Sequence, residues 1–193
     1  MSQFIIPTVD QQELESFDLV DEHDQPLGQT KARNLVHQDG DWHRAVHVWI
    51  VNSRNEILLQ KRGSKKKQYR DLWHLTLGGH VAAGGDLIDT CRRELFEELG
   101  IQIEQSELKY LFTVKWKSDP SFPFKDYEFN YVYLIRKDVS MFEIRINKEE
   151  VSDFKYVTIA EFSRMLDQEP EKLLPQYEEY RKVIDYLKKL TGK

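Results

Sequence analysis

The sequence has a single cysteine, Cys91, and no run of apolar residues near the roughly 18 that a membrane helix needs. A lone cysteine forms no internal disulfide and cannot by itself build a thiolate zinc site, so we expect a reducing, cytoplasmic location. The first ten residues also lack the basic and apolar segments of a secretory signal. These absences exclude a disulfide scaffold and predict neither secretion nor a membrane partner.

Repeats, low-complexity tracts and Gly/Ser linkers are also missing, and the chain has no excess of positive charge. Its 193 residues include 28 basic and 33 acidic side chains, which gives a formal net charge of −5. Because general binding to nucleic acid depends on neutralising phosphates, we expect no nucleic-acid partner. Chemistry on a phosphate must then rely on local basic groups or a bound cation. Since no linker marks a boundary, we expect one globular domain over residues 1–193.

Apolar periodicity predicts strands and helices that alternate along the chain. The clearest helix covers residues 86–99, where five apolar residues follow the spacing of one helical face and Gly100 provides a stop. A turn is expected at residues 24–28. Strands are expected at 17–20, 43–51, 57–60, 72–77, 108–116, 129–135 and 151–157, and further helices at 159–166 and 175–190. This order predicts an α+β or α/β sandwich.

Three glutamates, Glu94, Glu97 and Glu98, share one face of the helix at 86–99, because they are three and four residues apart. That face lies roughly opposite the apolar one, so we expect the carboxylates close together near the surface. Their mutual repulsion is unfavourable unless a cation binds, and oxygen-only ligands suit Mg²⁺ or Mn²⁺. A solvated charged face is the alternative. The glycine pairs at 78–79 and 84–85, which allow a ligand close to the backbone, favour a binding site.

The segment from Gly79 to Ile101 resembles the box that defines the Nudix hydrolases. Gly79, Arg93-Glu94-Leu95, Glu97-Glu98 and Gly100-Ile101 match this box in order and spacing. The surrounding strand order is also similar, over about residues 17–157. The resemblance implies the Nudix fold, an α+β (α/β/α) sandwich with a mixed β-sheet flanked by helices, and a single Nudix hydrolase domain over residues 1–193.

The same resemblance implies a divalent-metal pyrophosphatase site, with Glu94, Glu97 and Glu98 as ligands of Mg²⁺ or Mn²⁺. Cleavage of a P–O–P bridge requires neutralised oxygens and a positioned water, and a cation held by these carboxylates can supply both. The candidate catalytic residues are Glu94, Glu97 and Arg93, although an acid outside the box can equally serve as the base. By analogy with the family Arg93 orients a glutamate through a salt bridge; the alternative is an ordinary helical ion pair.

One position departs from the box. Gly85 stands where the first glutamate belongs, and Asp86 follows it directly. Either Asp86 substitutes through a one-residue shift of the loop, or the first acid is absent. Because the acids of the helix are intact, we expect slowed or altered chemistry rather than none.

Outside the box, the chain is similar to the Nudix branch that contains type I isopentenyl-diphosphate isomerase. The similar stretches are residues 17–22, 43–49 and 61–67 and the pair Gly79-His80. In that enzyme, histidines matching His43 and His80 and acids matching Asp126 or Glu128 build a metal site. The critical cysteine of the isomerase is Gly78 here, whereas this chain keeps the box acids that the isomerases have largely lost. Both differences favour hydrolysis over isomerisation.

Six basic residues lie within the ten that end at Arg70. By the same resemblance, Arg62 and Lys66 are the best matches to residues that grip the substrate diphosphate, and both side chains can bind phosphate. A solvated basic loop is the alternative. The remaining candidates for substrate binding are His80, Glu128 and Gly79.

The other features leave alternatives open. His43 and His47 share a strand face and are either packed side chains or part of the site. The four tryptophans are expected mainly in the core. The loop at 119–124 shapes the substrate pocket by analogy with the family. The helix at 175–190 either packs on the domain, which we favour, or forms a homodimer interface.

The predicted function is therefore that of a Mg²⁺-dependent hydrolase, with Mn²⁺ as the other candidate cofactor. Its partner is a small molecule, a nucleoside diphosphate derivative or a related compound, that is cleaved at a diphosphate linkage. Two other functions stay open. His43, His80 and Glu128 favour an isopentenyl-diphosphate isomerase, which Gly78 opposes, and Gly85 suggests a non-catalytic nucleotide-binding domain.

Overall fold

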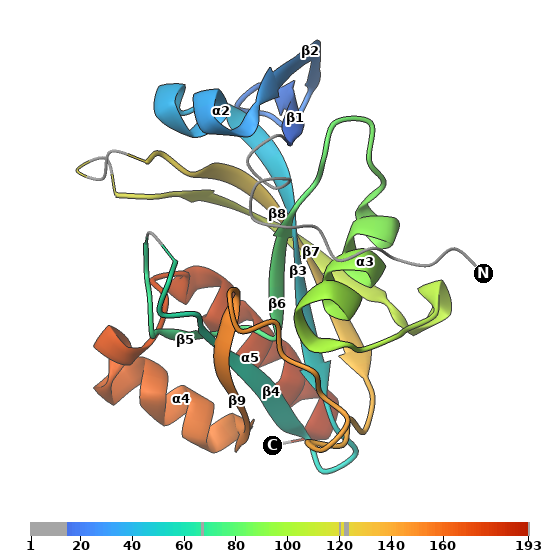
Figure 1. Cartoon of the computed structure of the whole chain (residues 1–193). Coiled ribbons are helices and arrows are strands. Elements are labelled where there is room, and N and C mark those ends of the chain that lie inside the picture. The colour runs from blue at the N-terminus through green and yellow to red at the C-terminus, as the bar shows by residue number, and fades with distance from the viewer. Residues whose placement is uncertain (1–14, 67, 120, 122–123, 193) are drawn as a thin grey trace.

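The structure, a computed structural model, describes residues 15–66, 68–119, 121 and 124–192. Within these residues a mixed sheet forms the centre of the molecule (Figure 1). Its strands are β1 (Ser16–Val20), β2 (Pro26–Ala32), β3 (Trp42–Val51), β4 (Glu56–Arg62), β5 (Trp73–His74), β6 (Leu77–His80), β7 (Lys109–Lys117), β8 (Tyr127–Arg136) and β9 (Val151–Thr158). The helices are α2 (Arg33–Asp39), α3 (Leu87–Leu99), α4 (Ile159–Gln168) and α5 (Tyr177–Thr191), with short 3₁₀ turns at Gln105–Glu107 and Pro170–Lys172.

Strand β3 organises the sheet, because it pairs with different strands along its length. It runs parallel to β8 from end to end, and β7 extends the sheet beyond β8. On its other side, β6 pairs antiparallel with Ala45–Val48, whereas β4 pairs only with the last two residues of β3. Strands β6 and β4 therefore leave β3 at different points, and side chains from both line the cavity described below.

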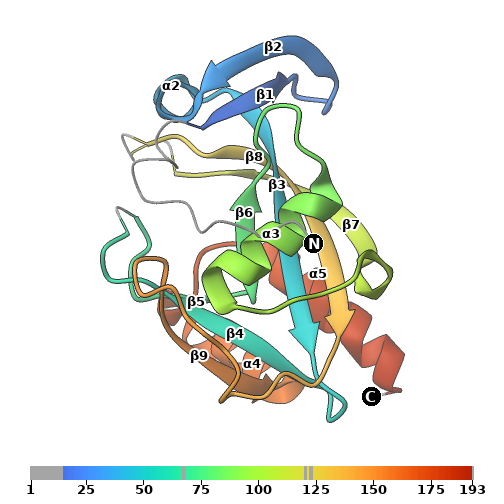
Figure 2. The ribbon, with the colours of Figure 1, turned by 45° about the vertical axis from the view of Figure 1, so that its right-hand side comes forward.

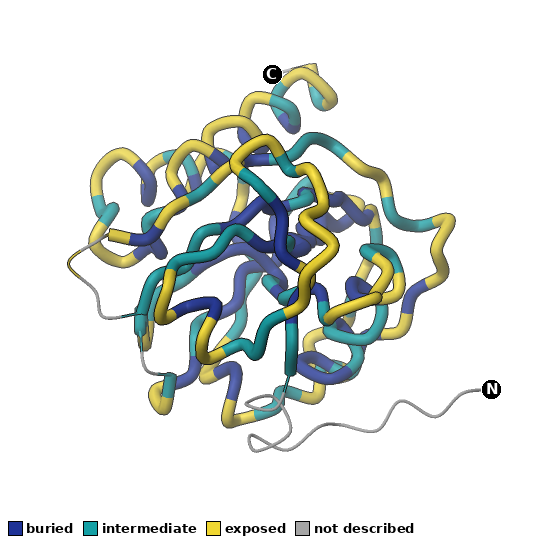
Figure 3. The backbone as a smooth tube through the Cα atoms, turned by 90° about the horizontal axis from the view of Figure 1, so that it is seen from above, coloured by how far each residue is buried: buried dark blue, intermediate teal, exposed yellow. Residues whose placement is uncertain are grey.

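Alternate residues of β3 pack against helices on opposite faces of the sheet, as the two-residue period of a strand requires. Val46, Val48 and Ile50 belong to a core cluster with Cys91, Leu95 and Leu99 of α3. Trp49 and Val51 belong to the other cluster, with apolar residues of α4 and α5. Figure 2 shows α3 in front of the strands and α5 behind them, and Figure 3 shows the buried residues gathered in the interior. The expected sandwich of helices around a mixed sheet is confirmed.

The C-terminal helix α5 packs on the sheet, which is the alternative that we favoured. Tyr180, Val183, Ile184 and Leu187 are buried in the cluster that contains Trp49. Of the four tryptophans, Trp49 is fully buried, whereas the others are half-buried. No helix in the described part of the chain is long and apolar enough to span a membrane.

The turn expected at residues 24–28 is wrong. The chain reverses three residues earlier, at 21–25, where the carboxylate of Asp21 accepts hydrogen bonds from the backbone N–H groups of His23 and Gln25. Pro26 then begins strand β2, and the sequence analysis did not identify this strand because its side chains are largely exposed and show no apolar alternation. Helix α2, which ends at Gly40 in the left-handed conformation, was not identified either.

Candidate functional site

Helix α3 carries the three box glutamates, and its start and end follow from local sequence. The Asp86 side chain accepts hydrogen bonds from the N–H groups of Ile88 and Asp89, at 2.7 and 3.1 Å, and so caps the helix. Gly100, with φ of 69°, ends the helix in the left-handed conformation that suits glycine.

The glutamates are not near the surface as expected. Glu97 and Glu98 are buried, and the side chain of Glu94 is only 12% exposed. The reason is a segment from outside the box that covers the end of α3. The backbone N–H groups of Arg145 and Asn147 donate to the carbonyls of Leu99 and Glu98, both at 2.9 Å. This segment lies beside Glu97, whereas Glu94 packs on Gly79 of β6 and Glu98 accepts a hydrogen bond from Gln60 of β4. Parts of the chain outside the helix thus bury a helical face that the periodicity alone assigns to solvent.

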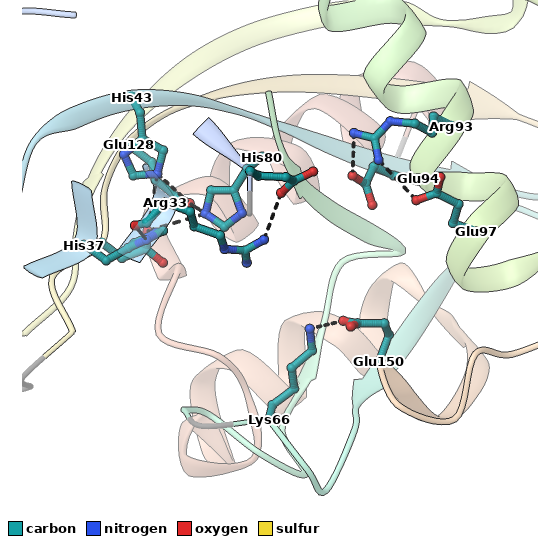
Figure 4. A network of polar contacts seen from close by, with 12 residues as sticks. Arg33, His37, His43, Lys66, His80, Arg93, Glu94, Glu97, Glu128 and Glu150 are labelled. Carbon is teal, nitrogen blue, oxygen red and sulfur yellow. Dashed lines mark hydrogen bonds and ion pairs between the residues drawn. The ribbon is translucent and has the colours of Figure 1, made fainter. Parts of the chain in front are cut away.

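Glu94 packs directly on the backbone of strand β6. A Cβ atom on Gly79 would lie 2.6 Å from Cγ of Glu94, so only glycine leaves room for this carboxylate. Arg93 pairs with Glu94 at 2.9 Å and with Glu97 at 3.1 Å, and Figure 4 shows its guanidinium between the two. Arg93 therefore fixes two of the three acids.

A cavity of about 80 Å³ brings most of the expected site residues together. Its lining includes six of them, Gly79, His80, Glu94, Glu98, Arg62 and Lys66, and also Gly78. The rest of the lining consists of polar side chains that were not expected at the site: Glu15, Arg33, Gln60, His74 and Glu150. Within it, Gln60 Nε2 donates to Glu98 at 3.1 Å, and Lys66 pairs with Glu150. Glu97 lies outside this cavity and lines a larger one, of about 680 Å³, at the other side of α3.

The basic stretch after β4 divides between the cavity and the surface. Arg62 and Lys66 line the cavity, whereas Lys65 is exposed and pairs with Glu149 at 2.6 Å. Lys61 lies over the ring of Trp73, and Lys67 is outside the described residues. The solvated-loop alternative thus describes only part of the stretch.

Burial dominates the electrostatics of the cavity. It raises the pKa of Glu94 to about 7, where Glu98 and Glu97 add to the effect and Arg93 opposes it. Burial also raises the pKa of Glu98, against the opposing charges of Lys66 and Arg62. The pKa of Lys66 falls to about 8, again chiefly because of burial. Acids and bases that are this poorly solvated favour a ligand of mixed charge, such as a divalent cation with a diphosphate.

A second group of potential ligands lies next to this cavity and comes from four parts of the chain. It comprises His37 of α2, His43 of β3, His80 of β6 and Asp126 just before β8, each with a ligand atom within 4.8 Å of the others. Asp126 Oδ1 lies 3.3 Å from Nε2 of His37 and 3.7 Å from those of His43 and His80. Glu128 Oε1 lies 3.2 Å from His80 Nε2 (Figure 4). We call these five residues the histidine–carboxylate cluster.

The donor atoms of this cluster suit a metal ion. Nδ1 of His37 and Nδ1 of His43 lie 2.7 and 3.1 Å from the carbonyls of Arg33 and Asp41. A carbonyl can only accept, so both Nδ1 atoms carry the proton and both Nε2 atoms present a lone pair. These Nε2 atoms, like that of His80, make no well-aligned hydrogen bond with a described residue. Three imidazole nitrogens and carboxylate oxygens that point at one place are the donor set of a divalent metal.

In the absence of a metal, the histidines of the cluster differ in charge. Burial, together with the neighbouring His80, lowers the pKa of His43 to about 3, so its imidazole is neutral. Burial and Arg33 oppose the charge on His80, but Asp126 and Glu128 outweigh them and raise its pKa to about 9. Without a metal, the protonated His80 supplies the positive charge that these two carboxylates require. A bound divalent cation would take over that role, and His80 would then bind it through a deprotonated Nε2.

The box position that departs from the pattern stays without an acid. Both hydrogen bonds to the Asp86 carboxylate come from the helix that it caps, so this side chain is engaged in capping. A Cβ atom on Gly85 would lie 2.8 Å from the carbonyl oxygen of Ala82, so the loop has no room for a side chain at that position. Of the two alternatives, the structure supports an absent first acid.

Six residues of the site were not found from the sequence: His37, Arg33, Glu15, Gln60, His74 and Glu150. Arg33 pairs with Glu15 at 3.1 Å, and both line the cavity. His37 sits six residues before His43, on a helix that the apolar pattern did not reveal. A histidine near the strand that carries His43 was the only signal available.

Comparisons with known proteins identify relatives of this chain. Residues 41–177 match the NUDIX domain. The chain is 34% identical over 181 residues to Nudix hydrolase 3 of Arabidopsis thaliana, a match that covers 90% of this chain and 23% of that protein. It is 31% identical over 170 residues to an isopentenyl-diphosphate Delta-isomerase of Pectobacterium atrosepticum, covering 87% of this chain and 90% of that protein.

Solved structures show the same fold. The crystal structure of DR0079 from Deinococcus radiodurans aligns with a TM-score of 0.59 and 22% identity, covering 80% of this chain and 90% of that one. The MutT protein of Methanosarcina mazei aligns with a TM-score of 0.58 and 17% identity, covering 79% and 96%.

Proposed function

The chain belongs to the Nudix hydrolase family, and from that premise we propose that it cleaves a P–O–P linkage with the help of Mg²⁺ or Mn²⁺. The substrate class that we propose is a nucleoside diphosphate derivative or a related small molecule, and the acting unit is one domain over residues 1–193. The observation that carries the proposal is the cavity in which Glu94 and Glu98 face Arg62 and Lys66. Carboxylates that can bind a cation and basic side chains that can bind a diphosphate therefore line the same cavity.

The metal would be held by the box glutamates. Glu94 and Glu98 line the cavity and would bind the cation directly. Glu97 lies outside the cavity and pairs with Arg93, which also pairs with Glu94, so the Arg93 pairing would have to open before Glu97 became a ligand. When bound, a divalent cation neutralises phosphoryl oxygens and acidifies a coordinated water. The histidine–carboxylate cluster would hold a second ion, and its nitrogen donors suit Mn²⁺ or Zn²⁺ better than Mg²⁺.

The other site residues bind and orient the substrate. Arg62 and Lys66 would contact the diphosphate oxygens, with Lys66 exchanging its pairing with Glu150 for the ligand. Gly79 keeps Glu94 close to the backbone, and Arg93 is a positioning residue for the acids. His80 and Glu128 border the cavity from the side of the histidine–carboxylate cluster.

The test is turnover of a panel of nucleotide sugars, dinucleotides, nucleoside diphosphates and prenyl diphosphates with Mg²⁺ or Mn²⁺, followed by phosphorus NMR. We expect cleavage at a P–O–P bond, with a loss of about a hundredfold to a thousandfold in the Glu98→Gln variant, because the cation loses a charged ligand. The exposed Glu171→Gln variant is the matched control and should behave as the wild type. Turnover that is unchanged in Glu98→Gln would contradict the proposal.

A second candidate, isopentenyl-diphosphate isomerisation, is favoured by the histidine–carboxylate cluster and by relatives that carry that name. The absent thiol at position 78 opposes it. A Cβ atom on Gly78 would meet the ring of His47 at 3.4 Å, an ordinary contact, so a cysteine has room there. Deuterium exchange into isopentenyl diphosphate in D₂O separates the two functions. We expect no deuterium exchange with the wild type. Exchange at a rate typical of an enzyme would establish isomerisation instead of hydrolysis.

A further inference from the structure

A hollow of about 210 Å³ lies between strands β7 and β8 and the start of α5, apart from the cavity of the box glutamates. Figure 1 shows these elements crossing on the side of the sheet that α5 covers. Apolar surface comes from Val114 and Trp116 of β7 and from Pro175 before α5, and three charged residues, Lys115, Glu178 and Glu179, also line the hollow. Two primary amides, Asn130 and Gln176, also line it.

These amides lack partners in a way that is unusual for buried groups. Asn130 is fully buried, and neither its amide nitrogen nor its amide oxygen hydrogen-bonds to a described residue. Gln176 is 8% exposed, and its Oε1 is also unpartnered within the described chain. An unsatisfied buried polar group is costly, and most such groups in native proteins are paired. Two of them lining one hollow indicate a ligand that completes their hydrogen bonds.

The walls of the hollow are held rigidly. Glu179, on the first turn of α5, accepts a hydrogen bond from Trp49 Nε1 at 2.8 Å and pairs with His47 Nδ1 at 2.6 Å. Both oxygens of this buried carboxylate are therefore engaged, and α5 is tied to β3. Asn130 sits between Ala45 of β3 and Val114 of β7 in the sheet. Rigid walls that carry unpaired amide groups favour the binding of a ligand of defined shape.

The hollow shares no lining residue with the cavity of the box glutamates, but strand β8 connects it to the histidine–carboxylate cluster. Asn130 is two residues beyond Glu128 on β8, so both side chains are on the same face. Trp116 is the register partner of Glu128 on β7. Glu128 lies 3.2 Å from His80, which lines the cavity of the box glutamates. A molecule whose diphosphate lies in that cavity can place its organic group against Asn130.

We propose that the Asn130–Gln176 hollow binds a flat heterocycle with neighbouring hydrogen-bond donors and acceptors, the chemistry of a nucleobase, as the organic group of the substrate. This proposal rests on the proposed function for the identity of the diphosphate. Apolar walls contact the faces of the ring, and the two amides pair with its edge. An alkyl or prenyl group leaves both amides unpaired, so the hollow selects against it.

The experiment separates binding from catalysis. Adenosine, guanosine, cytidine and uridine, which carry no phosphate, are titrated into the full chain while the side-chain amide signals of Asn130 and Gln176 are followed by NMR. We expect at least one nucleoside to shift both signals. The Asn130→Leu and Gln176→Leu variants should lose that binding by roughly tenfold to a hundredfold, while Gln102→Leu, a glutamine at the larger cavity, should keep it.

An Asn130→Asp variant guards against a folding defect in Asn130→Leu, because it keeps the size of the side chain and replaces a donor by an acceptor. It should change which of the four nucleosides binds best. The inference is overturned if no nucleoside binds the wild type, or if binding is the same in all variants. If nucleosides bind through Asn130 but no P–O–P compound is cleaved, the inference stands and the proposed function fails.

Discussion

The two groups of potential metal ligands lie on either side of a single strand, β6, and differ in almost every other respect. Glu94 packs on Gly79, whereas the next residue, His80, belongs to the histidine–carboxylate cluster, because neighbouring residues of a strand face opposite ways. The box glutamates come from one helix and offer only oxygen. The other cluster draws on segments from α2 to β8 and offers mainly nitrogen.

This difference implies that the two groups bind different kinds of metal ion. Oxygen donors at helical spacing suit a hard cation that accompanies a diphosphate, whereas preoriented imidazoles suit a firmly bound ion of borderline softness. The two groups are neighbours, because His80 of the histidine–carboxylate cluster lines the cavity in which Glu94, Glu98, Arg62 and Lys66 lie. If the two groups bind separate ions, a substitution in one group removes one ion and leaves the other. The loss of each ion then has a different effect on turnover and on metal affinity.

The largest effect that sharpens the comparison comes from the paired glycines of β6. In Gly79→Ala the new Cβ meets Glu94 Cγ at 2.6 Å and displaces the carboxylate, so kcat should fall about a hundredfold. Gly78→Ala is the matched control, since its Cβ meets His47 only at 3.4 Å and should change kcat by less than about twofold. Steady-state kinetics and Tm of both variants make the test. Equal losses in the two would show that the Glu94 contact does not matter.

Next in size is the loss of one ion. His43→Ala removes a buried ligand from the histidine–carboxylate cluster, so affinity for Mn²⁺ at that place should fall about tenfold to a hundredfold. Activation by millimolar Mg²⁺ at the box glutamates should persist in this variant. Isothermal titration of metal-free protein, followed by turnover with added Mg²⁺, gives both quantities. If this variant binds both ions as tightly as the wild type does, the histidine–carboxylate cluster is not a metal site.

The smallest effect concerns the ion pair that ties α5 to the sheet. Burial opposes the charge on His47, but Glu179 outweighs it and raises the pKa of His47 above its ordinary value. The pair therefore stabilises the fold fully below about pH 6.5, and its contribution falls as the pH rises through the raised pKa. Glu179→Gln should lose about 1.5 kcal/mol of unfolding free energy at pH 6 and less at pH 9.

Urea unfolding of both proteins in metal-free buffer measures that difference. A destabilisation that grows with pH would contradict the assigned charge states. The conservative Glu178→Gln variant, on the exposed side of the same turn, should show no pH-dependent difference.

Much of the fold could be predicted because it depends on local patterns. The helix expected at 86–99 is α3 at Leu87–Leu99, and the apolar spacing of the C-terminal helix led to its packing on the core. The box glutamates were found for the same reason, since three- and four-residue spacings define a helical face. Their burial was not predictable, because the parts of the chain that contact them, Gly79 of β6, Gln60 of β4 and the segment at Arg145 and Asn147, lie outside the helix.

The histidine–carboxylate cluster, in contrast, could not be assembled from local patterns. The resemblance to the isomerase branch named His43, His80, Asp126 and Glu128, but no periodic pattern brings these residues together. His37 was missed because α2 is a short helix whose two buried residues give no clear apolar stripe. Asn130 was missed because an amide in a strand looks the same whether it is paired or not. Its meaning depends on the hollow that β7 and α5 create around it.

The most direct test of two distinct ions is a crystal grown with Mn²⁺ and analysed by anomalous diffraction. The account predicts two peaks, one among the Nε2 atoms of His37, His43 and His80 and one beside Glu94 and Glu98. A single peak in the histidine–carboxylate cluster, with Glu98 still bonded to Gln60, would contradict a metal site at the box glutamates and with it the proposed hydrolysis.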